Sequence, residues 1–250
     1  MLALVLSMGA SLVCFAGEIP TEQKNSMTIT ADKLSENAKT LLKEADIDYE
    51  NATSIALTKG TTSGMMSRST VSGNTFNALQ LTKTGEDGLV EIENIVFLDD
   101  NDNVVPASAS DFSIINPSIK YFNDGDYILA AKCSYYLYTD GFNTYINPYM
   151  VAVKYTLGSG ITNISADLTA HGVKAYQSNF QDVSQTLVNA TKSVSKNSPA
   201  YGTYYYSSQS KWSTVYCVRI FSDFYGSGLS MYVSYTASSG AKGNMTFTYF

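Results

Sequence analysis

Apolar and polar residues alternate along most of this chain. In the segment 229–236, for example, Leu229, Met231 and Val233 alternate mainly with serine and threonine. Successive residues of a strand point to opposite faces of a sheet, so a period of two predicts strands with one buried and one wet face. The predicted strands are 53–59, 76–84, 89–98, 112–122, 127–139, 145–157, 161–176, 201–207, 212–222, 229–236 and 244–250. Residues 180–193 fit either a strand or a short helix crossing between sheets.

Turn-forming sequences separate these strands. Asn, Asp and Gly cluster at 123–126, 140–141, 158–160 and 226–228, and these residues tolerate the backbone conformations of tight turns. Many short strands with turns about every dozen residues are typical of an antiparallel β-sandwich. We therefore predict that residues 51–250 form one mainly β domain of this kind, with two smaller β domains as the alternative.

One segment has the period of a helix instead. Its apolar positions recur mostly at intervals of three or four and are Leu34, Ala38, Leu41, Leu42 and Ala45. Thr30 precedes them as a candidate N-cap. The pattern predicts an amphipathic helix at about 31–46, within an N-terminal segment 17–50, whose leucine stripe packs on the sheet.

The first sixteen residues predict an export signal. Leu2 to Ala16 form an apolar run of 15 residues that is too short to span a membrane comfortably, and small residues stand at Cys14 and Ala16, just before Gly17. This is the pattern of a signal peptide with its cleavage site. We therefore expect residues 1–16 to be removed and the mature protein to be secreted into the extracellular space.

Export changes the interpretation of the cysteines. Cys133 and Cys217 remain after removal of the signal, and both lie in predicted strands. In an oxidising compartment two such residues favour a disulfide over free thiols. Closing a loop of about 85 residues would contribute roughly 4–5 kcal/mol on the chain-entropy model. Two separate buried thiols are the alternative.

Composition narrows the partners. Apolar residues make up 44% of the chain and charged residues 15%, which is compatible with a folded core. The formal net charge of −6 argues against a nucleic-acid partner, which would require a basic face. No apolar stretch of 18 or more residues follows the first twenty positions, so no membrane-spanning helix is expected in the mature chain.

Tyrosine is the most uneven component of the sequence. Of 19 tyrosines, 17 lie from Tyr127 onward, and three of them are consecutive. Consecutive strand residues face both sides of a sheet, so at least one of the three must face solvent. Exposed aromatic rings can stack on sugars or anchor a protein partner. The candidate ligand-binding residues are Tyr204, Tyr205, Tyr206 and Trp212. The alternative is that these rings only fill half-buried strand positions.

Catalytic and metal-binding patterns are weak. His171 is the only histidine, so any histidine-dependent triad would have to use it, and we interpret it as an exposed residue. Residues 99–103 resemble the start of a calcium loop but lack the later ligands, so a hairpin turn is the preferred interpretation. The tyrosine-rich half has four carboxylates, Asp140, Asp167, Asp182 and Asp223, with no visible pairing. No catalytic residue, metal site or cofactor is predicted.

These observations favour a secreted, non-catalytic binding or adhesion module. Its expected ligand is a carbohydrate or an extracellular protein surface, because tyrosine is abundant and catalytic patterns are weak. Two other classes stay open. One is a secreted hydrolase that uses aspartates whose pairing the sequence does not reveal. The other is a pore-forming or bacteriocin-like toxin, whose Ser/Thr-rich alternating strands would rearrange into membrane hairpins.

Overall fold

The fold is described from a computed structural model of the chain. It describes residues 27–29, 34, 36–62, 74–98, 104–105, 127–156, 160–221, 227–240 and 242–250. The single helix of these residues is α1 (Glu36–Glu44). The strands are β1 (Met27–Ile29), β2 (Ser54–Thr62), β3 (Asn74–Thr84), β4 (Leu89–Leu98), β5 (Val104–Val105), β6 (Tyr127–Thr139), β7 (Thr144–Thr156), β8 (Ile161–Tyr176), β9 (Asp182–Asn197), β10 (Tyr205–Tyr206), β11 (Tyr216–Ile220), β12 (Gly228–Ala237) and β13 (Lys242–Thr248).

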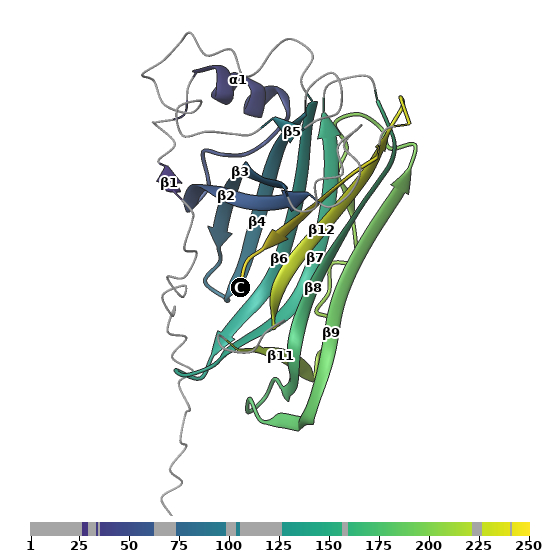
Figure 1. Cartoon of the computed structure of the whole chain (residues 1–250). Coiled ribbons are helices and arrows are strands. Elements are labelled where there is room, and N and C mark those ends of the chain that lie inside the picture. Colours follow the sequence, from purple (N-terminus) through teal and green to yellow (C-terminus); the bar gives the residue numbers. More distant parts are fainter. Residues whose placement is uncertain are drawn as a thin grey trace, which may run out of the picture.

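All thirteen strands belong to one sheet, and every recorded pairing is antiparallel (Figure 1). The order is β1-β2-β13-β12-β8-β11-β7-β6-β4-β3, with β5, β9 and β10 attached to β4, β8 and β7. β2 pairs with β13 and also with β3. The predicted mainly antiparallel β structure is therefore confirmed, whereas two separate stacked sheets, as in a sandwich, are not seen.

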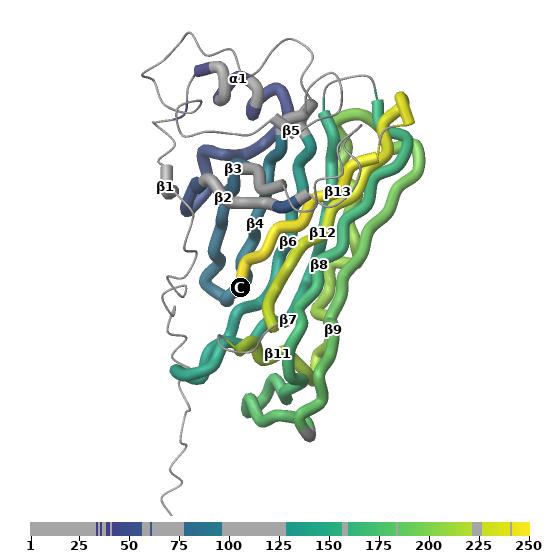
Figure 2. Tube along the Cα trace, in the orientation of Figure 1, coloured from purple at the N-terminus to yellow at the C-terminus, as the bar shows by residue number. Residues whose placement is uncertain are grey.

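One buried apolar cluster is shared by most strands of the sheet. β13 runs beside β12 (Figure 2), and the residues that follow it contact strands distant in the pairing order. Asn94 in β4 donates a hydrogen bond of 2.6 Å to the Tyr249 hydroxyl. The rings of Tyr135 in β6 and Phe250 meet edge to face at 6.1 Å. Strands far apart in the pairing order thus share one apolar interior, whose burial stabilises the fold.

The pairing of β11 with both β7 and β8 requires a close approach of two backbones. Val218 and Arg219 lie opposite residues of both neighbouring strands. Gly172 in β8 permits this, because a Cβ atom there would lie 2.2 Å from the carbonyl oxygen of Arg219. Only glycine leaves the necessary space.

Helix α1 ends in a Schellman motif that turns the chain back onto the sheet. The amide of Ile47 donates to the Leu42 carbonyl at 2.9 Å, and the amide of Asp46 donates to the Lys43 carbonyl at 3.0 Å. Asp46 has the left-handed φ of 53° that this motif requires. Leu34 and Leu42 are fully buried. The helix lies within the predicted range of about 31–46, although residues 30–33 and 35 are outside the described part.

The predicted disulfide between Cys133 and Cys217 is not present, and this prediction is corrected. Both residues are buried free thiols. Cys133 faces the main core, whereas Cys217 lies in a separate cluster with Tyr145 and Ala175. Val218 and Ile220 are the residues of β11 that belong to the main core. The period of two therefore places the two sulfurs on opposite faces of the sheet, a fact that the sequence alone could not reveal.

Two other predictions concern the ends and loops of the chain. Among the described residues, no helix is long and apolar enough to cross a membrane. The predicted signal peptide at 1–16, the predicted strand at 112–122 and the turn at 99–103 lie outside the described residues.

The state of the two thiols can be tested by alkylation. Burial raises the pKa of both Cys133 and Cys217 to about 12. Because the thiolate is the reactive form, we expect iodoacetamide at pH 8 to label neither residue in the native protein and both in urea without a reductant. Peptide mass spectrometry would score the labelling. Labelling in urea that needs prior reduction would show a disulfide and refute the assignment.

Candidate functional site

The segment that carries the predicted binding residues runs along the edge of β7. Tyr205 and Tyr206 pair with Val153 and Ala152. The pairing continues beyond β10, because the amide of Ser207 donates to the Val151 carbonyl at 2.8 Å. Backbone hydrogen bonds therefore hold the segment against the sheet and fix the direction of its side chains.

The three consecutive tyrosines divide between two faces, as alternation requires. The rings of Tyr204 and Tyr206 lie 5.7 Å apart at an angle of 44°. Tyr205 points the other way, and its hydroxyl accepts a 2.7 Å hydrogen bond from the amide of Ala200. Tyr206 is 46% exposed, whereas Tyr204 and Tyr205 are half-buried. One of the three rings is thus freely accessible.

Trp212 is held apart from these tyrosines. It is half-buried and packs against the main core. Its amide donates to the side-chain oxygen of Asn147 at 2.9 Å, and the amide group of Asn147 donates to the carbonyls of Ser213 and Tyr216 at 2.7 and 3.0 Å. Asn147 is fully buried. It anchors the chain before β11, and no ring contact between Trp212 and the three tyrosines occurs within the described residues.

A buried polar cluster surrounds Tyr204. Its hydroxyl donates a hydrogen bond to the carboxylate of Glu93 in β4. The ammonium groups of Lys154 and Lys132 lie 4.3 and 4.9 Å from the centre of the Tyr204 ring, and Lys132 lies 3.5 Å from Glu93. Burial, followed by the negative charge of Glu93, raises the pKa of Tyr204 well above its usual value.

Lys154 connects this cluster to the helix. It is only 1% exposed. Its ammonium group donates to the carbonyl oxygens of Ala45 at 2.5 Å and Asp46 at 3.2 Å, just past the last residue of α1. A cation is favoured at this end of a helix because the unpaired carbonyls carry partial negative charge. Burial lowers the pKa of Lys154. We interpret the cluster as a set of structural contacts that hold α1, β7 and the Tyr204 segment together, rather than as a binding site.

A second aromatic group lies on β6 and β7, and we call Tyr136, Tyr138, Tyr149 and Lys211 the aromatic strip. The rings of Tyr136 and Tyr138 are nearly parallel, 6.2 Å apart and 10° inclined. The Tyr149 ring meets Tyr136 edge to face at 5.6 Å. Lys211 lies 4.3 Å from the Tyr136 ring and donates to the Tyr138 hydroxyl at 2.9 Å. All four side chains are half-buried and so retain accessible surface.

The predicted binding residues include no member of this strip. The two-residue spacing places Tyr136 and Tyr138 on one face of a predicted strand. Tyr149 joins them across a hairpin whose register shifts between Ser134 and Tyr135. Lys211 comes from 73 residues further along than Tyr138. Nothing in the sequence around Tyr149 or Lys211 indicates that these residues contact Tyr136 and Tyr138.

Two of the carboxylates considered as catalysts have structural partners. Asp140 accepts hydrogen bonds from the amides of Phe142 and Asn143 at 2.9 and 2.8 Å and from the Tyr145 hydroxyl at 2.8 Å. Burial opposes its charge, but these bonds together hold the pKa of Asp140 below its ordinary value. Asp182 pairs with Arg219 at 2.9 Å.

Among the described residues, the other candidates do not come together in a catalytic or metal-binding site. The Nδ1 atom of His171 lies 2.5 Å from the side-chain oxygen of Asn189 on the outer face of β8, where the residue is half-buried. No group of three or more potential metal ligands forms among the described residues. Asp223 lies outside them.

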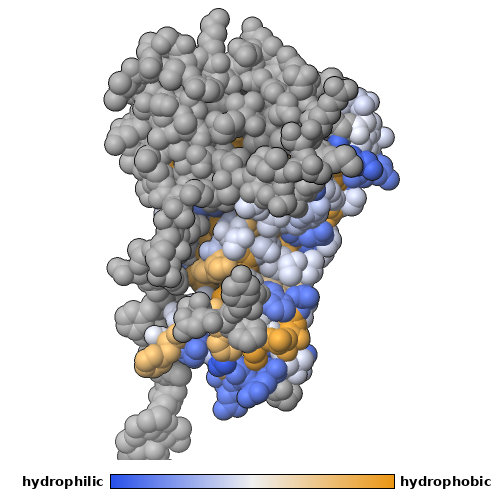
Figure 3. Space-filling model, in the orientation of Figure 1, coloured by the Kyte–Doolittle hydropathy of each residue, from blue (hydrophilic) through white to orange (hydrophobic). Residues whose placement is uncertain are grey.

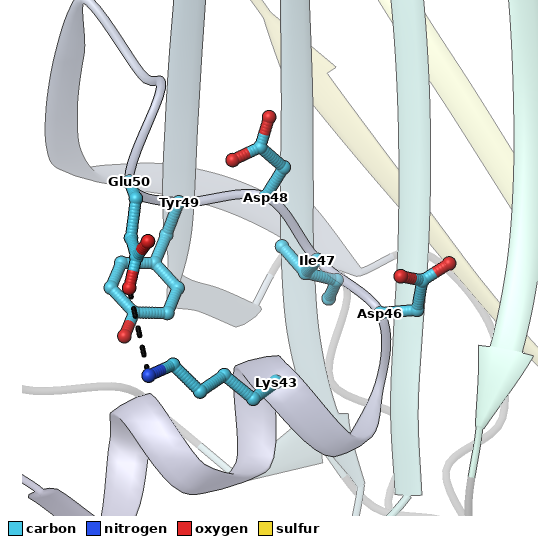
Figure 4. A pocket seen from close by; sticks show the side chains of 6 residues that line it. All are labelled: Lys43, Asp46, Ile47, Asp48, Tyr49 and Glu50. Atoms are coloured by element: carbon cyan, nitrogen blue, oxygen red, sulfur yellow. Dashed lines mark ion pairs between the residues drawn. The ribbon is translucent and has the colours of Figure 1, made fainter.

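A shallow hollow of about 270 Å³ lies beside the end of α1 (Figure 4). In this view Lys43 reaches from the helix towards Tyr49 and Glu50, while Asp46 and Asp48 point away from it. The Lys43 ammonium lies 3.6 Å from the Glu50 carboxylate. The proximity of Tyr49 and then of Glu50 raises the pKa of Lys43. Its charge is thus already balanced, and the hollow presents no unpaired cation to a ligand.

No protein-family model, curated protein or solved structure matches this chain. Function is therefore inferred from the side chains that the fold brings to its surface. The aromatic strip and Tyr206 present accessible aromatic rings, and such rings can stack on sugars or anchor a protein partner.

The role of the buried cluster can be tested with Tyr204→Phe. This change removes only the hydroxyl that donates to Glu93, so the carboxylate loses this hydrogen bond and keeps its ion pair with Lys132. We expect the free energy of unfolding to fall by about 1–3 kcal/mol, measured by urea denaturation. Tyr201→Phe is the matched control, because Tyr201 is 56% exposed and should change by less than about 0.5 kcal/mol. Equal effects of the two changes would contradict the structural role.

Tyrosine titration gives a pH-dependent test. Burial raises the pKa of Tyr138 and Tyr145 to about 12, and it raises those of Tyr204 and Tyr249 as well. These groups bind protons more tightly in the folded state, so their stabilising effect is complete below pH 10 and is lost as the pH rises through 12. The lowered pKa of Lys154 acts in the opposite direction.

We therefore expect absorbance at 295 nm to show two classes of tyrosine. The class with raised pKa values, which includes Tyr138, Tyr145, Tyr204 and Tyr249, ionises only together with alkaline unfolding, followed by circular dichroism. A single transition near pH 10 in a protein that stays folded would refute this.

Proposed function

We propose that the mature chain is a secreted, non-catalytic binding or adhesion module. Its ligand is a carbohydrate or an extracellular protein surface. The observation that supports this most directly is the aromatic strip, in which aligned tyrosine rings and a lysine are ordered by contacts with one another yet remain accessible. Tyrosines of this kind form energetic centres of interfaces because they contribute large contact areas at a small cost in conformational entropy.

The strip is prepared for binding before any ligand arrives. The edge-to-face contact of Tyr149 with Tyr136, and the hydrogen bond from Lys211 to Tyr138, restrict the rotamers of the two central rings. A ligand that stacks on them therefore loses little affinity to side-chain ordering. Lys211 adds a donor and a positive charge beside the rings, which suits hydroxyl, carbonyl or carboxylate groups of a ligand.

The partners of two candidate aspartates argue against hydrolysis by those two residues. Glycoside and peptide hydrolysis need a group that can donate a proton at the reacting bond. Asp140 has a lowered pKa and a full set of turn hydrogen bonds, and Asp182 is engaged by Arg219.

The predicted signal peptide, residues 1–16, supports export as the route to an extracellular ligand.

The double change Tyr136→Ala and Tyr138→Ala tests this proposal. The protein would be applied to arrays of immobilised glycans and of purified extracellular proteins, and the tightest hit would be followed by calorimetry. We expect the affinity for that hit to fall at least tenfold, which corresponds to about 1.4 kcal/mol. Tyr201→Ala is the control, because it removes an exposed ring elsewhere. The proposal fails if the wild-type protein binds nothing, or if the double variant binds as tightly as wild type.

A further inference from the structure

A second surface differs sharply from the aromatic strip. It consists of the outward residues of three neighbouring strands: the odd positions 163–171 of β8, the odd positions 189–197 of β9 and the even positions 230–236 of β12. We call it the hydroxyl face. Eleven of these fourteen positions are Ser, Thr or Asn, and the others are Asp167, His171 and Tyr232. In Figure 3 the surface over these strands is largely pale, with scattered blue positions.

Residues that lie opposite one another on β12, β8 and β9 form rows across this face, and the central row contains Asp167. Cross-strand hydrogen bonds join residues within other rows. Ser165 and Ser234 are joined by a 2.7 Å bond between their hydroxyls. On the other side of the central row, Thr169 and Thr191 are joined at 3.1 Å. The amide of Asn163 donates to the side-chain oxygen of Asn197 at 2.6 Å. These bonds fix side-chain rotamers on a rigid sheet, so the face is pre-organised for a ligand.

The central row is arranged differently. Asp167 lies opposite Ser193 on one side and Tyr232 on the other. Tyr232 is 38% exposed. Within the part of the chain that the structure describes, the Asp167 carboxylate forms no hydrogen bond or ion pair, although its neighbouring rows are joined. A lone carboxylate beside an exposed ring, framed by hydroxyls, is thus available to an external donor.

We propose that the hydroxyl face binds a neutral glycan. Sugar hydroxyls both donate and accept, as do the Ser, Thr and Asn side chains of the face. A carboxylate can accept bonds from two adjacent hydroxyls, and a tyrosine ring can pack against the apolar side of a sugar ring. The inference goes beyond the proposed function, because it assigns a second surface and a ligand class that the aromatic strip does not specify.

Other classes of partner fit the face poorly. The fourteen positions include no Lys or Arg, although Lys242, which pairs with Thr236, borders the face, so a nucleic acid or a sulfated glycan finds no cluster of cations there. Protein interfaces are enriched in aromatic residues, Met and Arg and are depleted in Ser, whereas this face has a single aromatic ring. The one carboxylate repels anionic ligands and favours uncharged ones.

The test uses an array of neutral hexose and N-acetylhexosamine oligosaccharides beside sulfated and uronic-acid glycans. We expect the wild-type protein to bind neutral members, and Asp167→Asn and Tyr232→Ala each to weaken that binding at least tenfold in calorimetry. Tyr232→Phe keeps the ring and should retain the affinity within about threefold, a difference below about 1 kcal/mol. Tyr201→Ala, away from this face, should bind as wild type does. Thermal unfolding would verify that each variant is folded.

Three results would overturn the inference. The first is binding of acidic glycans alone or of no glycan. The second is neutral-glycan binding that neither Asp167→Asn nor Tyr232→Ala changes. The third is glycan binding lost only in the Tyr136→Ala/Tyr138→Ala variant, which would assign it to the aromatic strip and leave the proposed function standing.

Discussion

The outer part of this structure depends on the contacts of one buried charged group, the ammonium of Lys154. It connects three chain segments that are remote in sequence: the end of α1 through the Ala45 carbonyl, β7 through its own backbone, and the segment before β10 through the Tyr204 ring. A buried cation is costly unless it is solvated by the protein. Here helix carbonyls, a tyrosine ring and the nearby Glu93 provide that solvation. The segments can therefore pack only in the arrangement that keeps this charge satisfied.

Because the inward side chains form the core, the surface that remains for binding lies on the outward faces of the sheet. The inward face of the sheet is filled by side chains from nearly every long strand. The last residues of the chain also contribute to this core, where they contact Asn94 and Tyr135. Within the described residues the interior thus contributes stability and leaves the outward faces for recognition. Because the register fixes which residues face out, β8 between residues 163 and 171 has apolar residues at its inward positions and only polar residues at its outward ones.

The sequence predicted local structure better than long-range contacts. The period of two placed β6 at 127–139 and β8 at 161–176, where the structure has them. Residues 180–193, which fitted strand or helix, lie mostly in β9 because they pair along β8. The disulfide prediction was wrong because strand identity does not reveal which strands adjoin. For the same reason, the contacts of Glu93 with Tyr204 and of Lys211 with Tyr138 had no local signal.

The distribution of charge explains why two outward faces of one sheet differ. The lysines at 132, 154 and 211 all lie against tyrosine rings on the side of β6 and β7, where ring faces stabilise a cation that is partly removed from water. The hydroxyl face has no such rings apart from Tyr232, so a lysine there would gain little beyond hydration. Aromatic residues and cations therefore lie together on that side, whereas the fourteen positions of the hydroxyl face include no Lys or Arg. This separation by ordinary side-chain energetics gives a single small fold two surfaces with different chemical preferences.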